Sequence, residues 1–142
     1  MSDVLILHHP PGYTPEEVAL RAAREDLAYA KHAASGDFHA PACFHAQQAA
    51  EKAVKSLHYR RGARAVIGHN VRALIQSLDP PVPALERHLD AARELDLFYI
   101  TSRYPNGLDS GTPGEAFSAE QSARALDAVA KTLSPAEAAL GA

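Results

Sequence analysis

Apolar residues recur at spacings of three and four along most of the chain, the pattern of helices that bury one face. The clearest case follows Thr14, a predicted N-cap, with Pro15 in the first turn and Glu17 completing a capping box. Gly36 marks its predicted end. The stripe that this first helix is expected to bury consists of Leu20, Ala23, Leu27, Ala30 and Ala34.

The same pattern predicts four more helices and no convincing strand. The second runs from about Phe38 to Arg61 and ends at Gly62. The last is capped by Ser118, with Gln121 at the capping-box position. The predicted ranges are 38–61, a short helix between Gly68 and Asp79, one from near Pro83 to about 101, and 118–133. The short third helix is expected to bury Val71, Leu74, Ile75 and Leu78.

Short connections between amphipathic helices favour antiparallel neighbours. We therefore predict an all-α fold, an antiparallel up-and-down bundle of four to five helices. The predicted division is an N-terminal arm (1–14), the helical bundle (15–133) and a C-terminal tail (134–142). The segment 102–116 is rich in Pro and Gly and is expected to be an ordered, irregular loop.

Composition narrows the class of protein without naming a function. The 142 residues are 46% hydrophobic and 22% charged, which is ordinary for one globular domain. The longest strongly apolar run, Val4 to Leu7, is too short for a membrane helix and follows no basic segment, so a cytoplasmic location is expected. The formal net charge of -3 argues against general affinity for phosphate backbones, although a local basic site remains open.

Cys43 is the single cysteine, which excludes an internal disulfide and a thiolate zinc cage. It stands in an alanine-rich helical pattern without an activating neighbour in sequence, so a buried structural cysteine is expected. The histidines are scattered and form no metal-binding motif. We expect neither a metal nor a cofactor.

Three segments in order resemble the HEPN family: "HAQQAAEKA", then "GHNVRALIQSL", then "RYP" with Glu115 downstream. The similarity extends from about Glu16 to Leu133. The resemblance implies an antiparallel helical bundle, usually dimeric, connected with nucleotides or RNA. It also implies a minimal nucleotidyltransferase as partner, in a pair of the toxin–antitoxin kind.

The second helix carries an unusual set of polar residues. His45, Gln48 and Lys52 are spaced to share one face, and a neighbouring stripe contains Phe44, Gln47 and Glu51. One interpretation is a pocket whose amides and cation contact a base, ribose or phosphate. The other is that these groups satisfy one another, or a partner chain, across a bundle or dimer interface. The sequence leaves both open.

Active members of the family resemble metal-independent endoribonucleases, whose mark is an Arg followed four to six residues later by His. Arg64 and His69 match that spacing, but before the third helix rather than towards the last core helix. Such a His moves the proton of a ribose hydroxyl while the Arg stabilises charge on phosphorus. The alternative is that His69 caps the third helix and Arg64 is solvated or paired.

Arg103 and Tyr104 form a further candidate ligand site in the loop, where they would clamp a phosphate and stack on a base. They are equally suited to a packing role. Three hypotheses follow: a dimeric nucleotide- or RNA-associated module, an endoribonuclease that uses Arg64 and His69, and a structural oligomeric helical subunit without ligand.

Overall fold

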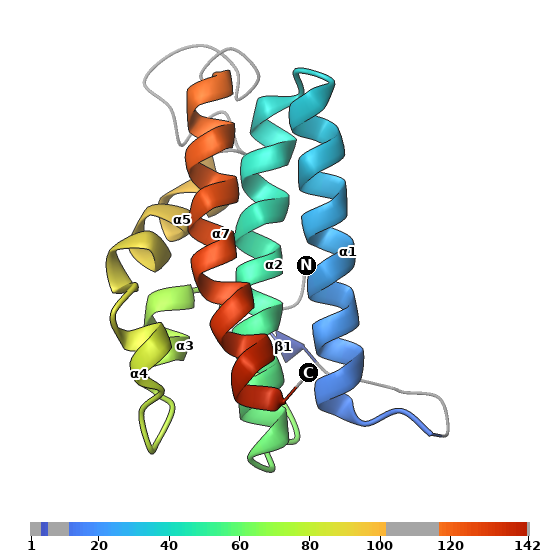
Figure 1. Cartoon of the computed structure of the whole chain (residues 1–142), viewed down its shortest axis with the longest axis vertical. Helices are drawn as coiled ribbons and strands as arrows, with labels where there is room; N and C mark the ends of the chain where they lie inside the picture. The colour runs from blue at the N-terminus through green and yellow to red at the C-terminus, as the bar shows by residue number, and fades with distance from the viewer. Residues whose placement is uncertain (1–3, 6–11, 102–116, 142) are drawn as a thin grey trace.

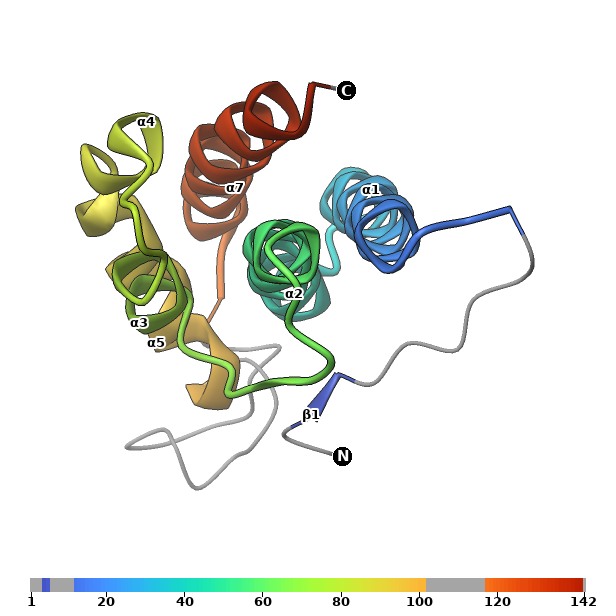
Figure 2. The same ribbon diagram turned by 90° about the horizontal axis from the view of Figure 1, so that it is seen from below.

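The computed structural model describes residues 4–5, 12–101 and 117–141, and most of this part of the chain is helical. Its four long helices, α1 (Pro15–Ser35), α2 (His39–Arg60), α5 (Leu89–Thr101) and α7 (Ala119–Leu140), run alternately up and down (Figure 1). Seen along the helix axes, α2 lies between α1, α7 and α5 (Figure 2). The predicted all-α, antiparallel up-and-down bundle is therefore confirmed.

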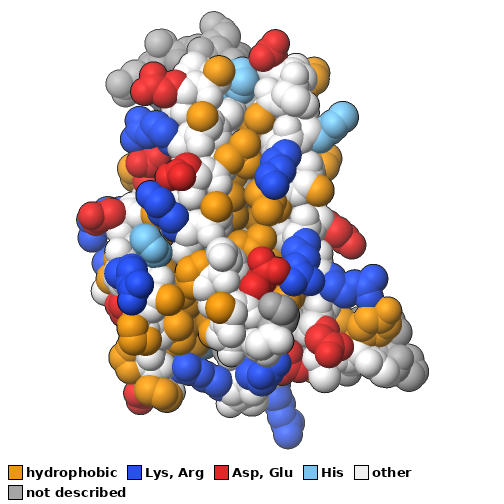
Figure 3. Space-filling model, in the orientation of Figure 1, with side chains coloured by type: hydrophobic (Ala, Val, Ile, Leu, Met, Phe, Trp, Pro, Cys, Tyr) orange, Lys and Arg blue, Asp and Glu red, His pale blue; other side chains and the backbone are white. Residues whose placement is uncertain are grey.

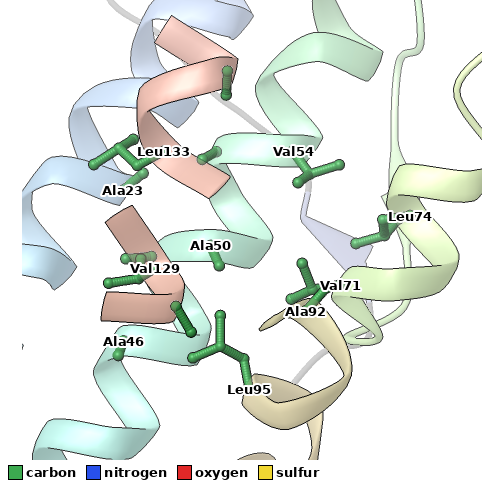
Figure 4. Packing of buried hydrophobic residues seen from close by; sticks show 14 of the residues in the cluster. Ala23, Ala46, Ala50, Val54, Val71, Leu74, Ala92, Leu95, Val129 and Leu133 are labelled. Carbon is green, nitrogen blue, oxygen red and sulfur yellow. The ribbon is translucent and has the colours of Figure 1, made fainter. Parts of the chain in front are cut away.

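The central position of α2 depends on its small side chains. Their size lets neighbouring helices approach α2 closely, because the distance between helix axes is set by the side chains at the contact. Figure 4 shows buried side chains of α7, α5 and α3 (Val71–Gln76) gathered around Ala46, Ala50 and Val54. The residues of α2 without exposed surface include Ala42, Cys43, Ala46, Ala49, Ala50, Ala53 and Val54.

Both predicted capping boxes are present. The Thr14 side chain accepts a hydrogen bond from the Glu17 backbone N–H (3.3 Å), and Glu17 accepts from the Thr14 N–H (3.2 Å). At α7, the Gln121 side chain accepts from the Ser118 N–H (2.9 Å). These side chains satisfy N–H groups that have no partner within their own helix, and they explain why both starts were predictable from sequence.

The single helix predicted from near Pro83 to about 101 is wrong. The structure has α4 (Pro83–Glu86) and α5, separated by Arg87 and His88. The break lets α4 pack against α3 and α7 while α5 packs against α2. Both Leu85 and Leu95 are fully buried as a result. The 3,4 spacing continues across the break, so the periodicity did not reveal it.

The last helix does not end at Leu133, as predicted, but continues to Leu140 with Pro135 inside it. An internal proline costs a helix about 3 kcal/mol because it removes one hydrogen bond and crowds the preceding turn. Ala136 is fully buried and Leu140 is 8% exposed, so burial of these side chains offsets that cost. Gly141 then ends α7 in the left-handed conformation (φ 75°).

No strand was predicted from the sequence, but the structure contains a pair of two-residue strands. β1 (Val4–Leu5) pairs antiparallel with β2 (Val66–Ile67), with Val4 opposite Ile67. Two-residue strands are too short to show alternating polarity, and their pairing joins segments far apart in the chain.

The face of the molecule in Figure 3 has mixed character. Acidic and basic groups are interspersed over its upper half, and apolar side chains form a band along the seam between α7 and its neighbours (Figure 3). Among the described residues, no helix has the length and apolar character needed to cross a membrane. Because acidic and basic side chains are interspersed, the described residues in the upper half of this face form no extended patch of a single charge (Figure 3).

Candidate functional site

A buried carboxylate links one face of α2 to α1. His45 Nδ1 lies 3.1 Å from Asp26 Oδ1, and Lys52 Nζ donates to Asp26 Oδ2 at 2.5 Å. His45 and Lys52 are seven residues apart, hence two turns along one face of α2. Asp26 of α1 accepts from both. We call these three residues the Asp26 cluster.

The Asp26 carboxylate is ionised at neutral pH. Burial by itself raises the pKa of Asp26, but the hydrogen bonds and positive charge of His45 and Lys52 outweigh burial, so the pKa lies below its usual value of 3.8. The Asp26 side chain is 15% exposed, whereas those of His45 and Lys52 are 26% and 24% exposed. Part of each basic side chain therefore remains accessible from solvent.

A second cluster lies on the neighbouring stripe of α2 and centres on Glu51. Its Oε2 accepts from Lys55 Nζ at 3.2 Å, and its Oε1 lies 3.0 Å from His69 Nδ1. Glu51 and Lys55 are 4% and 1% exposed, so this is an ion pair inside the bundle. We call Glu51, Lys55 and His69 the Glu51 cluster. The sequence analysis did not single out Lys55, although its i,i+4 spacing from Glu51 was a visible signal.

The glutamines of the "HAQQAAEKA" segment point into the fold. Gln48 Nε2 donates to Gln47 Oε1 (2.8 Å), and Gln47 Nε2 donates to the His69 carbonyl (2.6 Å). Gln47 has no exposed surface and Gln48 is 7% exposed. The structure thus separates the predicted trio: His45 and Lys52 meet at Asp26, while Gln48 turns to Gln47.

His69 directly precedes the N-cap residue of α3 and does not cap the helix itself. Asn70 is the N-cap, and its side chain accepts from the Ala73 N–H at 2.7 Å. The Asp96 carboxylate of α5 accepts from the backbone N–H groups of Val71 (2.7 Å) and Arg72 (3.1 Å). Burial raises the pKa of Asp96, although these hydrogen bonds lower it in part. Two side chains therefore hold the first turn of α3 in place.

A series of rings connects the two clusters across α1, α2 and α5. His45 packs against Tyr29 of α1 (centroids 4.1 Å apart) and against Phe44 (5.2 Å). Tyr99 of α5 lies 6.0 Å from Phe44 and stacks on His69 at 4.3 Å and 20°. The two contacts of Phe44 lie within the range of about 4.5–7 Å typical of favourable aromatic pairs, and the other two are slightly closer. The histidines of the two clusters are thus joined by a continuous line of rings.

Arg64 and His69 do not belong to the Asp26 cluster. Arg64 is exposed on the segment between α2 and β2, while His69 is half-buried at the Glu51 cluster. Arg103 and Tyr104 lie outside the described residues. Of the predicted set, the structure brings together His45 and Lys52, and it adds Asp26, for which a single sequence offers no signal because it comes from another helix.

The predicted burial of Cys43 is confirmed: it has no exposed surface, and burial raises the pKa of its thiol to about 12. Nearby, His39 Nδ1 lies 2.6 Å from Ser122 Oγ and its Nε2 lies 3.5 Å from Asp37 Oδ1. These are the residue types of a hydrolase triad, but Ser122 is 2% exposed. No substrate reaches a hydroxyl buried in that way, so the contact ties α2 to α7.

Among the residues that the structure describes, no group of three or more His, Cys, Asp or Glu side chains is arranged to hold a metal ion. The carboxylates of both clusters are instead engaged by lysine and histidine. The basic groups of the two clusters that remain partly exposed are the His45 imidazole and the Lys52 ammonium on one face of α2, and the His69 imidazole before α3.

Comparison with known proteins places this arrangement in a family. The model of the HEPN domain matches residues 16–137. The crystal structure of TT1696 from Thermus thermophilus is 34% identical with a TM-score of 0.83, covering 89% of this chain and 98% of that one. ST0689, an archaeal HEPN homologue, is 31% identical (TM-score 0.72; 88% and 97% covered). A HEPN domain protein from Thermotoga maritima is 33% identical (TM-score 0.69; 87% and 98% covered). No curated protein matches the sequence. The chain belongs to the HEPN domain family.

Proposed function

We propose that this chain is a dimeric HEPN module that binds a nucleotide or RNA and works with a minimal nucleotidyltransferase, in a pair of the toxin–antitoxin kind. Family membership supports the class of partner and the dimer. The Asp26 cluster supports the proposed binding of a nucleotide or RNA. A cytoplasmic location and ligand contacts from Arg103 and Tyr104 belong to the same proposal.

The observation that carries the proposal is the concentration of ionisable side chains at two neighbouring stripes of α2. The free energy of removing ions from water is commonly larger than the attraction gained within a buried ion pair. Apolar residues of similar volume often give a fold equal stability. Stability alone therefore does not account for the six ionisable side chains of the Asp26 and Glu51 clusters. Lys52 offers three N–H donors, and one of them suffices for Asp26. The others suit a phosphate.

The test is binding of AMP and of a short unpaired RNA, measured by calorimetry, together with the mass of the protein in solution. Lys52→Met keeps the aliphatic stem and removes the charge. Lys131→Met is the matched control, since Lys131 pairs with Asp127 on the outer face of α7. We expect a dimer, and a loss of affinity of about tenfold in Lys52→Met alone. A monomer that binds neither ligand nor a minimal nucleotidyltransferase contradicts the proposal.

A metal-independent endoribonuclease is the second candidate, and one contact favours it. The Glu51 carboxylate holds His69 by Nδ1, which is how catalytic imidazoles are oriented. In that case His69 transfers the proton and Arg64 stabilises charge on the phosphate. Cleavage of a labelled RNA by the parent and its loss in His69→Ala would establish the activity. Equal cleavage by both proteins rejects these residues as its source.

The third hypothesis, a structural oligomeric subunit, predicts a different outcome. Gln48→Ala and Lys52→Ala would then change the mass of the assembly, while neither parent nor variants bind AMP or RNA. Gln48 already has its partner within the chain. An unchanged assembly in both variants counts against this version.

A further inference from the structure

A hollow of about 310 Å³ lies beside the turn between α1 and α2. Figure 1 shows this turn at the top of the bundle. Two exposed aromatic residues line the hollow: Tyr29 is 56% exposed and Phe38 is 66% exposed. Buried Ala33 contributes a small side chain to the lining. The remaining lining residues are His32 and Pro41. The hollow thus presents flat apolar surfaces and no carboxylate.

The turn is shaped to hold the Phe38 ring close. Asp37 adopts a positive φ of 64°, and the Phe38 N–H donates to the Ala33 carbonyl at 2.8 Å. A Cβ added at Gly36 would lie 3.2 Å from Cδ2 of Phe38. Glycine at this position therefore leaves room for the ring beside the turn. The hydrogen bond fixes the backbone of Phe38, and its exposed ring is accessible to a second ring.

The hollow adjoins the Asp26 cluster along both helices. Tyr29 is one turn from Asp26 on α1 and packs against His45 at 4.1 Å. Pro41 is one turn before His45 on α2. One turn of helix is about 5.4 Å, a length that a ribose bridges. A flat ring seated in the hollow would place an attached phosphate near His45 and Lys52.

From this geometry we infer that the hollow binds the base of a free or unpaired nucleotide by stacking on Tyr29 and Phe38, with the phosphate at His45 and Lys52. The inference rests on the proposed function and gives it a specific site. Base stacking on aromatic side chains tolerates any base, so the site distinguishes nucleotides from sugar phosphates rather than one base from another. The lining of the hollow carries no acidic group, which suits an uncharged base, and the phosphate would share the donors of His45 and Lys52 with Asp26.

The experiment compares AMP with ribose 5-phosphate, which lacks the base, by calorimetry and by saturation-transfer NMR. Tyr29→Leu and Phe38→Leu remove the rings while keeping apolar bulk. Tyr13→Leu is the matched control, an exposed tyrosine (39%) outside the hollow. We expect each of the first two variants to weaken AMP about tenfold or more, and the control to stay within about twofold. Ribose 5-phosphate should bind much more weakly than AMP, and saturation transfer should be strongest at the protons of the base.

Each other outcome overturns the inference in a recognisable way. AMP affinity that falls in Lys52→Met but not in the ring variants rejects the hollow and leaves the proposed function intact. Equal binding of AMP and ribose 5-phosphate rejects stacking. A change of mass in Phe38→Leu with AMP binding unchanged assigns the hollow to a contact between copies of the chain. No AMP binding by the parent rejects both the hollow and nucleotide binding.

Discussion

Replacing Glu51 with glutamine is the most direct test of the buried charges. The change keeps the shape of the side chain and removes the negative charge that Lys55 and His69 share. The Lys55 side chain is 2% exposed, so its ammonium would lose its carboxylate without gaining water. Breaking a buried pair from one side costs about 3–5 kcal/mol. We expect the free energy of unfolding to fall by that amount.

The effect is large enough to measure with ordinary unfolding curves. Domains of this kind are stable by about 5–15 kcal/mol, so the variant would lose a substantial part of the total. With a urea m-value of about 2 kcal/mol/M, the midpoint should fall by roughly 2 M. Urea unfolding followed by far-UV circular dichroism at pH 7 gives this number. Repeating it at several protein concentrations separates unfolding from dissociation of a dimer.

Two further variants make the reasoning refutable. Glu25→Gln changes an exposed glutamate of α1 and should alter stability by less than about 0.5 kcal/mol. The double variant Glu51→Gln with Lys55→Met removes both charges and should recover more than half of the loss, because the orphaned ammonium is gone. A loss below about 1 kcal/mol in Glu51→Gln, or no recovery in the double variant, would falsify the argument from the uncompensated lysine.

Three other predictions follow from single side chains. Asp26 stabilises the fold above its usual pKa of 3.8, and this contribution is lost as the pH falls through its lower folded value. Asp26→Asn should therefore lose less stability than the parent on acidification from about pH 4 to pH 2, measured by urea midpoints; parallel curves would contradict the lowered pKa. The buried Cys43 thiol, with its pKa of about 12, should resist iodoacetamide at pH 8 in the folded protein and react once urea unfolds it. Rapid labelling of the native chain would show that the thiol is accessible. Leu140→Ala should cost about 2 kcal/mol, near the low end for a buried leucine because it lies at a helix end. An unchanged thermal midpoint would mean that the final turns of α7 do not contribute to the core.

Some features of the fold follow from local chemistry and were predictable. The capping boxes at Thr14 and Ser118 place the starts of two helices because both partners lie within four residues. The stop near Leu133 was wrong for the opposite reason. Pro135 is a local signal against a helix, whereas the burial of Leu140 that outweighs it depends on contacts with the rest of the bundle.

The candidate site shows the same limit. The spacing of His45 and Lys52 revealed that they share a face of α2, but not that Asp26 lies between them. For the glutamines the spacing was misleading, because Gln48 shares that face in projection and yet donates to its neighbour Gln47. Helical periodicity predicts the face of the helix on which a side chain lies. It does not predict which residues of the neighbouring helix lie opposite that face.

By itself, the amino-acid sequence determined the helical class, the number of long helices and their main caps, because each depends on residues within a turn or two of one another. It also carried the resemblance to the HEPN family, through three segments in a fixed order. Only the tertiary structure decided which polar side chains meet. Asp26 reaches α2, Glu51 meets His69, and Tyr29 and Phe38 border one hollow. Each of these pairings depends on how two segments pack, and the free energy of that packing is shared by the whole core rather than encoded at any one position.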